Sequence, residues 1–249
     1  MTVLKCCWQI PRTSLILSSN DVHLWRANLD QSDECVKQIA QMLSEEEQRK
    51  TERFHLDKDR KRFIVTRGVL RTILSRYLDV EPNRLRLGYC SLGKPYLVEK
   101  SNGEEICFNL SHSHNLSLYA FTRGRQIGVD IEYIHPITEA DQIVARFFSS
   151  NEHAIWQQLP KGQKQEAFFN CWTRKEAYLK ARGEGLSLPL DQFDVSFDPG
   201  KRAALLLTSG ASDESSRWLL RAIQPGPGYV AALVVEGHDW RLKCWEWPF

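Results

Sequence analysis

Two acidic residues interrupt a run of strand-forming residues in the middle of the chain. Asp130 and Glu132 lie within the sequence QIGVDIEYI at 126–134, whose other residues favour an extended strand. Side chains alternate between the two faces of a strand, so both carboxylates point to the same face. Burial of two like charges is unfavourable unless a cation or a proton compensates them. A divalent cation is the simplest compensation, and oxygen ligands suit Mg²⁺; an exposed strand with a solvated polar face is the alternative.

A third carboxylate is expected on a helix further along the chain. Residues 166–182 have the sequence EAFFNCWTRKEAYLKAR and are followed by Gly183, which is typical of a helix and its terminating glycine. Trp172, Glu176 and Lys180 recur at every fourth position and therefore share one helical face. We expect this face to present Glu176 and Lys180 to a common site.

Asp130, Glu132 and Glu176, together with water and ligand oxygens, would form an octahedral Mg²⁺ site. An ordinary solvated ion pair between Lys175 and Glu176 is the alternative. A metal held by carboxylates commonly binds phosphate oxygens, which indicates phosphoryl or pyrophosphate chemistry. The absence of a G-x-x-x-x-G-K-[ST] loop and of a G-x-G-x-x-G turn disfavours P-loop and Rossmann enzymes.

Cationic side chains that could bind phosphates are concentrated in the first half of the sequence. The segment 49–71 contains nine Lys and Arg against three Asp and Glu. Arg60, Arg67 and Arg71 share a helical face, which indicates either an anion site or a solvated basic surface. The turn at Gly93-Lys94-Pro95 holds Lys94, either as a phosphate ligand or as an ordinary turn residue.

Composition limits the class of protein. The chain has 249 residues, 42% hydrophobic and 26% charged, with a net charge of +2, which is ordinary for a globular protein and gives no general attraction to nucleic acid or membrane. No apolar run reaches the roughly 20 residues of a membrane helix, and no signal-peptide pattern is found. The seven cysteines contain no C-x-x-C motif, which favours reduced thiols in a cytoplasmic protein and disfavours a structural zinc site.

A weak internal repeat indicates two similar halves. Strand-like segments at 22–29 and 127–134 are 105 residues apart, and the capping sequences LSEEE from residue 43 and FSSNE from residue 148 repeat at the same offset. We infer an α+β fold in which residues 1–124 and 125–249 form similar halves with a ligand site between them. Other elements are expected as a helix at 33–42, a loop at 160–164, and strands at 106–113, 116–122, 193–197, 203–207, 218–223, 229–235 and 241–245.

Several motifs together carry a family resemblance. They are GKP at 93–95, FNLSHS at 108–113, IGVDIE at 127–132, FFS at 147–149 and WTRKEAYLK at 172–180. In this order and spacing they resemble the Sfp-type 4′-phosphopantetheinyl transferases over roughly residues 43–195, and the layout is similar to the broad-range cyanobacterial branch. Each motif alone is weak, whereas their combination is specific.

The resemblance implies a pseudo-dimer of two α/β halves in one chain, with coenzyme A in the cleft between them. It places Mg²⁺ on Asp130, Glu132 and Glu176, and the phosphates and leaving group on Lys180. The residues that we expect to contact coenzyme A are Lys50, Arg62, Lys94, Ser111, His112, Lys175 and Lys180. The sequence departs from the family pattern at Glu47, where some relatives have a basic residue. The contact of that residue with the 3′-phosphate would have to come from Arg49 or Arg53 instead.

The implied reaction is transfer of 4′-phosphopantetheine from coenzyme A to a serine of an apo acyl or peptidyl carrier protein, with release of adenosine 3′,5′-bisphosphate. Asp130, Glu176 and Lys180 are the expected catalytic residues, and Glu176 is the candidate base. Carriers of fatty-acid, polyketide, peptide or glycolipid synthases are all compatible acceptors, and a fused pseudo-dimer is expected to act as a monomer. Two alternatives are a metal-dependent nucleotide pyrophosphate hydrolase and a nucleic-acid-binding module; the near-zero net charge disfavours the second.

Overall fold

The computed structural model describes residues 3–4, 6–11, 15–91, 93–98, 105–183, 188–198, 200–208 and 214–249. In chain order its elements are β1 (Val3–Leu4), β2 (Asp21–Asn28), α1 (Asp33–Ala40), α2 (Glu45–Thr51), α3 (Asp57–Leu78), η1 (Pro82–Arg84), β3 (Leu87–Tyr89), β4 (Pro95–Leu97), β5 (Ile106–Ser113), β6 (Leu116–Arg123), β7 (Ile127–Tyr133), α4 (Ala140–Phe147), α5 (Ser150–Gln158), α6 (Lys161–Arg182), η3 (Leu190–Gln192), β8 (Phe193–Val195), β9 (Leu205–Thr208), α7 (Glu214–Arg217), β10 (Trp218–Ile223), β11 (Tyr229–Glu236) and β12 (Arg241–Glu246).

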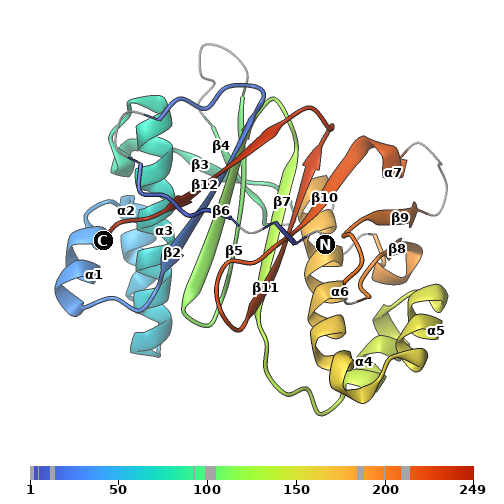
Figure 1. Ribbon diagram of the computed structural model, residues 1–249. Coiled ribbons are helices and arrows are strands. Elements are labelled where there is room, and N and C mark those ends of the chain that lie inside the picture. Colours follow the sequence, from blue (N-terminus) through green and yellow to red (C-terminus); the bar gives the residue numbers. More distant parts are fainter. Residues whose placement is uncertain are drawn as a thin grey trace.

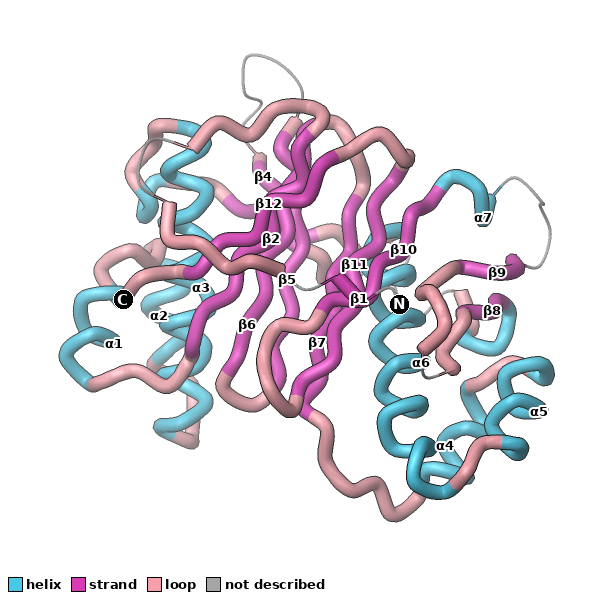
Figure 2. Tube along the Cα trace, viewed as in Figure 1, coloured by secondary structure: helices cyan, strands magenta, loops and turns pink. Residues whose placement is uncertain are grey.

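Two four-stranded sheets lie between the two long helices α3 and α6 (Figure 1). The strand order is β12-β2-β6-β5 in one sheet and β1-β10-β11-β7 in the other. Helix α3 packs on the outer face of the first sheet and α6 on that of the second. The inner faces pack on each other through alternating residues such as Leu24 and Leu118 from one sheet and Val129 and Leu233 from the other. Figure 2 shows the resulting order of helix, two sheets and helix.

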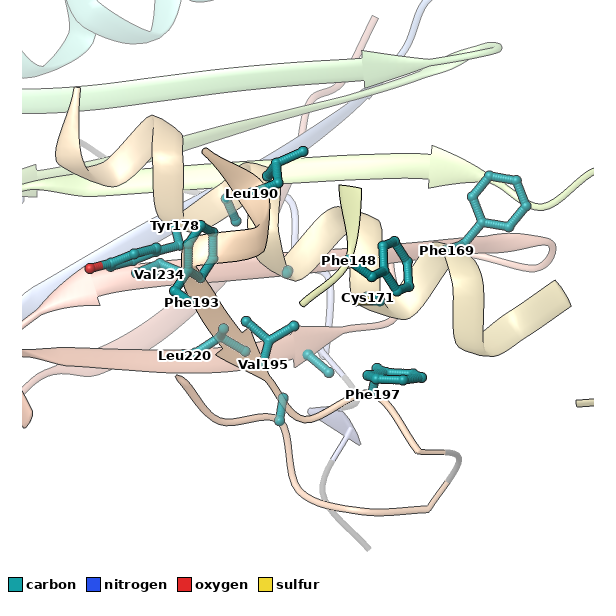
Figure 3. Close-up of a cluster of buried hydrophobic side chains, with 14 of the residues drawn as sticks. Phe148, Phe169, Cys171, Tyr178, Leu190, Phe193, Val195, Phe197, Leu220 and Val234 are labelled. Carbon is teal, nitrogen blue, oxygen red and sulfur yellow. The ribbon is translucent and has the colours of Figure 1, made fainter. Parts of the chain in front are cut away.

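The second half has an aromatic core that fixes α6 against its surroundings (Figure 3). Tyr178 of α6 packs edge-on against Phe193 of β8, with ring centroids 4.9 Å apart. Phe148, which follows α4, stacks on Phe168 of α6 at 5.8 Å. Because these large rings are almost fully buried, they restrict rotation of α6 about its axis.

The two halves repeat the same order of elements, which confirms the predicted α+β pseudo-dimer. The series β2, α1, α2, α3, η1, β3, β4, β5, β6 recurs as β7, α4, α5, α6, η3, β8, β9, β10, β11, with the short helix α7 as an addition before β10. The order of the paired strands is also the same, since β2-β6-β5 corresponds to β7-β11-β10. Helices α3 and α6 each contain 22 residues.

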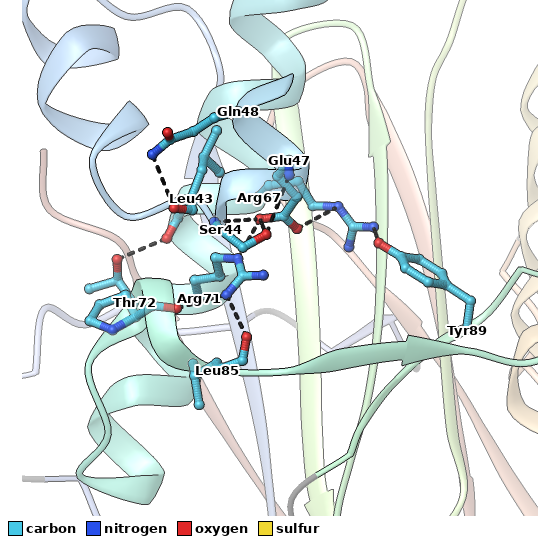
Figure 4. Close-up of polar contacts among 11 residues, drawn as sticks. Leu43, Ser44, Glu47, Gln48, Arg67, Arg71, Thr72, Leu85 and Tyr89 are labelled. Atoms are coloured by element: carbon cyan, nitrogen blue, oxygen red, sulfur yellow. Dashed lines mark hydrogen bonds and ion pairs between the residues drawn. The ribbon is translucent and has the colours of Figure 1, made fainter. Parts of the chain in front are cut away.

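A buried ion pair ties the short helix of the first half to its long helix (Figure 4). Ser44 and Glu47 form the predicted capping box at the start of α2. The buried carboxylate of Glu47 accepts a hydrogen bond from Arg71 of α3, and Arg71 also donates to the carbonyls of Pro82 and Leu85, both at 2.8 Å. Glu47 is therefore a structural residue, which fastens α2 to α3.

The second half contains the same arrangement. Ser149 and Glu152 form a capping box at the start of α5, and the Lys175 ammonium lies 2.8 Å from the Glu152 carboxylate. Lys175 also donates to the carbonyls of the first residue of η3 and of the residue that follows this helix, Leu190 at 2.7 Å and Phe193 at 2.5 Å, as Arg71 does at η1. Lys175 is therefore the counterpart of Arg71 in the repeat, and its charge is used inside the core.

The terminal strands pair across the predicted division into 1–124 and 125–249. Strand β1 pairs in parallel with β10, and β12 pairs in parallel with β2. Each half thus receives its fourth strand from the opposite end of the chain. The two sheets are therefore completed by exchange of the terminal strands.

Two local expectations differ from the structure. Arg60, Arg67 and Arg71 do not form an anion site, because Arg60 pairs with Asp57 and the other two arginines are directed at Glu47. Residues 160–164 are not a loop, since α6 begins at Lys161. The remaining predicted elements are found within a few residues of their expected ends.

All seven cysteines are free, as expected from the sequence. In the part of the chain that is described, no helix has the length and apolar character needed to cross a membrane.

Replacement of Lys175 with Met should destabilise the protein strongly, because it leaves the Glu152 carboxylate buried without its cation. We expect a loss of about 3–5 kcal/mol in the free energy of unfolding. Urea denaturation followed by circular dichroism measures it. Lys164→Met is the control, because Lys164 faces the exposed Asp141 at 3.3 Å and should contribute about 0–1 kcal/mol. Similar small losses in both variants would contradict the structural role of Lys175.

Candidate active site

Strand β7 presents its two acids to helix α6. Ile127, Val129 and Ile131 face the neighbouring sheet, so Asp130 and Glu132 point to the opposite side, as the alternation predicts. The first position on this side is Gly128, against which the backbone of α6 packs directly. The helix therefore lies immediately beside the carboxylates.

Helix α6 brings Glu176 and Lys180 to this side of β7. The Lys180 ammonium lies 2.7 Å from Oδ1 of Asp130 and 3.1 Å from the hydroxyl of Ser111. Burial, followed by the charge of Asp130, raises the pKa of Glu176, which precedes Lys180 by one helical turn on α6. The sequence prediction that these residues share one site is consistent with this geometry.

The first half contributes two hydroxyls to the same place. Ser111 of β5 donates to Oδ1 of Asp130 at 2.8 Å, and Ser113 donates to Oε2 of Glu132 at 2.7 Å. Both serines lie on one face of β5, two residues apart, as the two acids do on β7. The site is therefore built from strands of both halves.

The negative charges of the three carboxylates are only partly neutralised by their surroundings. Asp130 is only 4% exposed, and its Oδ2 has no hydrogen-bond partner among the described residues. Burial and the charge of Asp130 raise the pKa of Glu132, although the Ser113 hydrogen bond opposes the shift. Burial and the charges of Asp130 and Glu132 also raise the pKa of Glu176. One lysine cannot balance three carboxylates, so the site has an affinity for further positive charge.

These features fit a divalent cation. The donors are hard carboxylate oxygens, which Mg²⁺ prefers, and Asp130 offers one buried oxygen that is not otherwise used by the described residues. With Lys180 resting on Asp130, the described His, Cys, Asp and Glu side chains do not converge in a ready-made set of three ligands. Binding of an ion would thus require adjustment of Glu132, Glu176 or Lys180.

Two cavities with cationic walls lie in the first half. One, of about 490 Å³, is lined by Phe54, Asp59, Arg62, Phe63, Thr66, Arg67, Pro95, Leu110 and His112. The other, of about 760 Å³, shares Phe54 and is lined on its basic side by Arg49, Lys50 and Arg53. Together they provide room and positive charge for a phosphorylated nucleotide.

His112 follows Ser111 on β5, and its side chain lines the first cavity. Desolvation by its neighbours, then the charges of Arg62 and Lys180, lower the pKa of His112, although the residue retains exposure to solvent. Arg62 itself donates to the side-chain oxygen of Asn115 at 3.2 Å. His112 and Arg62 are placed so that an anion between them would meet one permanent and one inducible positive charge.

Comparisons with known proteins agree with this geometry. The model of the 4′-phosphopantetheinyl transferase superfamily matches residues 126–234, and that of the N-terminal part of 4′-phosphopantetheinyl transferase matches residues 25–122. The 4′-phosphopantetheinyl transferase HetI of Nostoc sp. is 38% identical over 98% of this chain and 100% of its own length. The chain belongs to the 4′-phosphopantetheinyl transferase superfamily. The predicted class of enzyme is thereby confirmed, including its similarity to a cyanobacterial member, and the hydrolase alternative has no support.

Other relatives are more distant. The transferase Sfp of Bacillus subtilis is 29% identical over 84% of this chain and 88% of its own. Among solved structures, a holo-(acyl-carrier-protein) synthase of Bacillus anthracis in complex with CoA (3′,5′-ADP) is 23% identical, with a TM-score of 0.37, and the match covers 45% of this chain and 94% of that chain.

Lys94 of this transferase does not point at the carboxylates. Its ammonium donates to the carbonyls of Lys180 at 2.6 Å, Ile127 at 3.1 Å and Ala181 at 3.4 Å. An ammonium group has three donors, and these three carbonyls use them. Lys94 therefore fastens the last turn of α6 to the start of β7, and a phosphate contact would require one of these bonds to break.

Lys175 is the expected coenzyme A contact that the structure contradicts. Its side chain points from α6 into the core, where it is 1% exposed and paired with Glu152. The preceding residue, Arg174, is also buried and donates to the carbonyl of Ser196. Neither cation can reach a ligand in the cavities, so Lys175 is a structural residue.

The remaining predicted residues fall into two groups. Ser111 and Lys180 touch Asp130 directly, and Arg62 and His112 line the adjoining cavity. Lys50 lines the outer cavity, where its ammonium lies 5.2 Å from the centroid of the Phe63 ring. Apart from Lys94 and Lys175, the expected contacts therefore follow a path from the carboxylates to the basic end of α2.

Ser113 and Asn109 also belong to the site, although neither was expected there. Ser113 donates to Glu132, and the side-chain oxygen of Asn109 accepts a hydrogen bond from the backbone N–H of Val129 at 2.9 Å. Their signal was the polar alternation of FNLSHS within a strand, which indicates a polar face that meets another polar surface.

Replacement of Lys94 with Met should loosen the end of α6. We expect the midpoint of thermal unfolding to fall by roughly 4–8 °C, from the loss of about 2 kcal/mol of charged hydrogen bonds. Because Lys180 lies in the loosened turn, kcat should fall about tenfold, whereas KM for coenzyme A should change less than about threefold.

Calorimetry and steady-state transfer assays measure these effects, with Lys201→Met as a control for an exposed lysine paired to Asp198. An unchanged midpoint together with a large increase in KM would show that Lys94 binds a phosphate instead.

Proposed function

We propose that this transferase moves the 4′-phosphopantetheine group of coenzyme A to a serine hydroxyl of an apo carrier protein in a Mg²⁺-dependent reaction. The observation that carries the proposal is the contact of Asp130 with both Lys180 and Ser111, beside a cavity lined by Arg62 and His112, the residue that follows Ser111 on β5. A carboxylate cluster next to a cationic cavity suits a metal-assisted transfer from a nucleotide pyrophosphate.

The metal would be held by Asp130, Glu132 and Glu176. The unused oxygen of Asp130 and the mutual repulsion of the carboxylates support this assignment. When bound, the ion would neutralise the pyrophosphate of coenzyme A and polarise the phosphorus that is attacked. Lys180 would exchange part of its contact with Asp130 for the phosphate oxygens.

The nucleotide end of coenzyme A would occupy the two cavities. Arg62 and His112 are placed to receive the 3′-phosphate, and Lys50 extends the positive charge along the outer cavity. Ser111 borders the pyrophosphate because it touches both Asp130 and Lys180. The loss of a basic residue at Glu47 would be compensated by Arg49 and Arg53, which line the same cavity.

The chain's own residues would carry the proton and the developing charge. The carrier serine hydroxyl attacks the β-phosphate, and Glu176 takes its proton, for which a raised pKa makes it a better base. Lys180 stabilises the negative charge that accumulates on the phosphate oxygens and on the leaving adenosine 3′,5′-bisphosphate. The carrier gains the phosphopantetheine arm through a new phosphodiester bond.

The acceptor would be an acidic carrier protein or carrier domain. The exposed Arg49, Lys50 and Arg53 form a basic surface that would attract it. Since one chain already contains both halves of the site, we propose that it acts as a monomer. Its seven free thiols support a cytoplasmic location.

The experiment that tests the function is intact-mass spectrometry of an apo acyl carrier protein incubated with this protein, coenzyme A and Mg²⁺. We expect a mass gain of about 340 Da, the mass of one phosphopantetheine, which is lost when EDTA is added. Cleavage of coenzyme A without modification of the carrier would instead indicate a hydrolase.

Replacement of Asp130 with Asn should remove the transfer activity while keeping the shape of the side chain. We expect the rate to fall at least ~100-fold, because an amide is a weak ligand for Mg²⁺ and cannot pair with Lys180. The mass assay measures the rate, and circular dichroism verifies the fold. Asp141→Asn is the control, since the Asp141 side chain is 72% exposed on α4. Retained activity in Asp130→Asn would remove Asp130 from the metal site.

Replacement of Glu176 with Gln should stabilise the metal-free protein near pH 7 and still abolish transfer. The pKa of Glu176 is raised in the folded state, so its ionised form destabilises the fold. This penalty is complete above the folded-state pKa and disappears as the pH falls below the unfolded-state pKa. We therefore expect the stability gain of the variant to shrink as the pH is lowered.

Thermal unfolding in EDTA across pH 4–8 measures this gain, with Glu166→Gln on the exposed part of α6 as the control. A loss of stability in Glu176→Gln at pH 7 would contradict the repulsion. In the wild type, the acidic limit of activity should lie above the usual glutamate pKa and move to lower pH as Mg²⁺ is increased, because the metal competes with protons.

A further inference from the structure

Strands β5 and β7 are the edge strands of their sheets, and polar side chains join them. The order of the described strands leaves one side of each without a ladder partner. Asn109 of β5 accepts the backbone N–H of Val129 at 2.9 Å, and Ser113 accepts the backbone N–H of Tyr133 at 3.0 Å. These two contacts lie four residues apart on both strands, so they hold the strands in register.

The contact of Ser113 with the backbone orients its hydroxyl group. Because Oγ accepts the N–H of Tyr133, its own hydrogen is free to point elsewhere, and it donates to Oε2 of Glu132 at 2.7 Å. Ser111 is used differently, since its hydroxyl donates to Asp130 and lies 3.1 Å from the Lys180 ammonium. Ser113 is thus a directional donor to one carboxylate.

Glu132 requires such a donor. It is half-buried near the end of β7, and the charge of Asp130 acts on it. Repulsion by Asp130 and attraction by solvent would both turn its flexible side chain away from the site. A hydrogen bond from a fixed hydroxyl opposes this rotation.

We propose that Ser113 is a positioning residue that keeps Glu132 directed toward the same divalent cation as Asp130. This inference rests on the proposed function. Ser113 belongs to the first half and Glu132 to the second, so the orientation of a metal ligand depends on how the halves are joined. The contact of Asn109 with Val129 maintains the register when Ser113 is changed, and a Ser113 variant should therefore fold.

The test is Mn²⁺ binding, followed by electron paramagnetic resonance, to the wild type, Ser113→Ala, Ser113→Thr and Ser117→Ala. We expect Ser113→Ala to raise the Kd for Mn²⁺ about tenfold, as loss of a residue that orients a ligand commonly does. Ser113→Thr keeps the hydroxyl and should stay within about threefold of the wild type. In transfer assays, the Mg²⁺ concentration for half-maximal rate should rise in parallel for Ser113→Ala, and excess Mg²⁺ should restore its rate.

Ser117→Ala is the matched control. Ser117 is a buried serine of β6 whose hydroxyl donates to the carbonyl of Ala27 at 3.2 Å. This hydrogen bond does not involve the carboxylates of the site. The Ser117→Ala change should lower the midpoint of thermal unfolding without changing Mn²⁺ affinity.

Three outcomes would overturn the inference. An unchanged Kd in Ser113→Ala, with the wild type binding Mn²⁺, rejects the role of Ser113 and leaves the proposed function intact. Equal weakening in Ser113→Thr and Ser113→Ala shows that packing, and not the hydroxyl, is responsible. A wild type that binds no Mn²⁺ rejects the metal site and this inference together, whereas the mass gain of the carrier tests the transfer separately.

Discussion

The close contact between helix α6 and strand β7 is the constraint on which the site depends. A Cβ atom at Gly128 would lie 2.1 Å from the carbonyl oxygen of Ala177 and 2.3 Å from the backbone nitrogen of Ala181, so only glycine permits this approach. The contact fixes the position of α6 along β7 at Gly128, two residues before Asp130. Lys180 can reach Asp130 because both elements are rigid and directly packed.

The pseudo-symmetry of the fold shows how one scaffold serves two purposes. With the offset of 105 residues, Asp130 and Glu132 correspond to Trp25 and Ala27 of β2, which are fully buried beneath α3. The first half therefore uses these positions for its core, and the second uses them for charge. The charged site forms where the serines of β5 meet the acids of β7, because this junction joins the polar face of one half to the charged face of the other.

Local patterns predicted the residues of the site because they depend on geometry within one element. Strand alternation placed Asp130 and Glu132 together, and helical spacing placed Glu176 near them. The prediction that Lys175 contacts coenzyme A was wrong because it ignored this geometry. One step along a helix turns the side chain by about 100°, and the step from Glu176 to Lys175 directs the ammonium toward Glu152 in the core. The exchange of β1 and β12 was not predictable, because a terminal strand pairs with whichever sheet edge the assembled halves leave open.

The carboxylate site is negative and the neighbouring cavity is positive. This difference in sign couples the binding of the metal to the binding of coenzyme A in the proposed reaction. Asp130, Glu132 and Glu176 with Lys180 leave an excess of negative charge, whereas Arg62 and its basic neighbours make the adjoining cavity positive. A pyrophosphate that bridges both would be attracted at one end and repelled at the other until a cation is bound. Metal and coenzyme A should therefore each raise the affinity for the other, by the same factor, because the coupling free energy belongs to the pair. The unfavourable burial of the carboxylates in the free protein is the source of that coupling, since it is relieved only when the positive charge arrives.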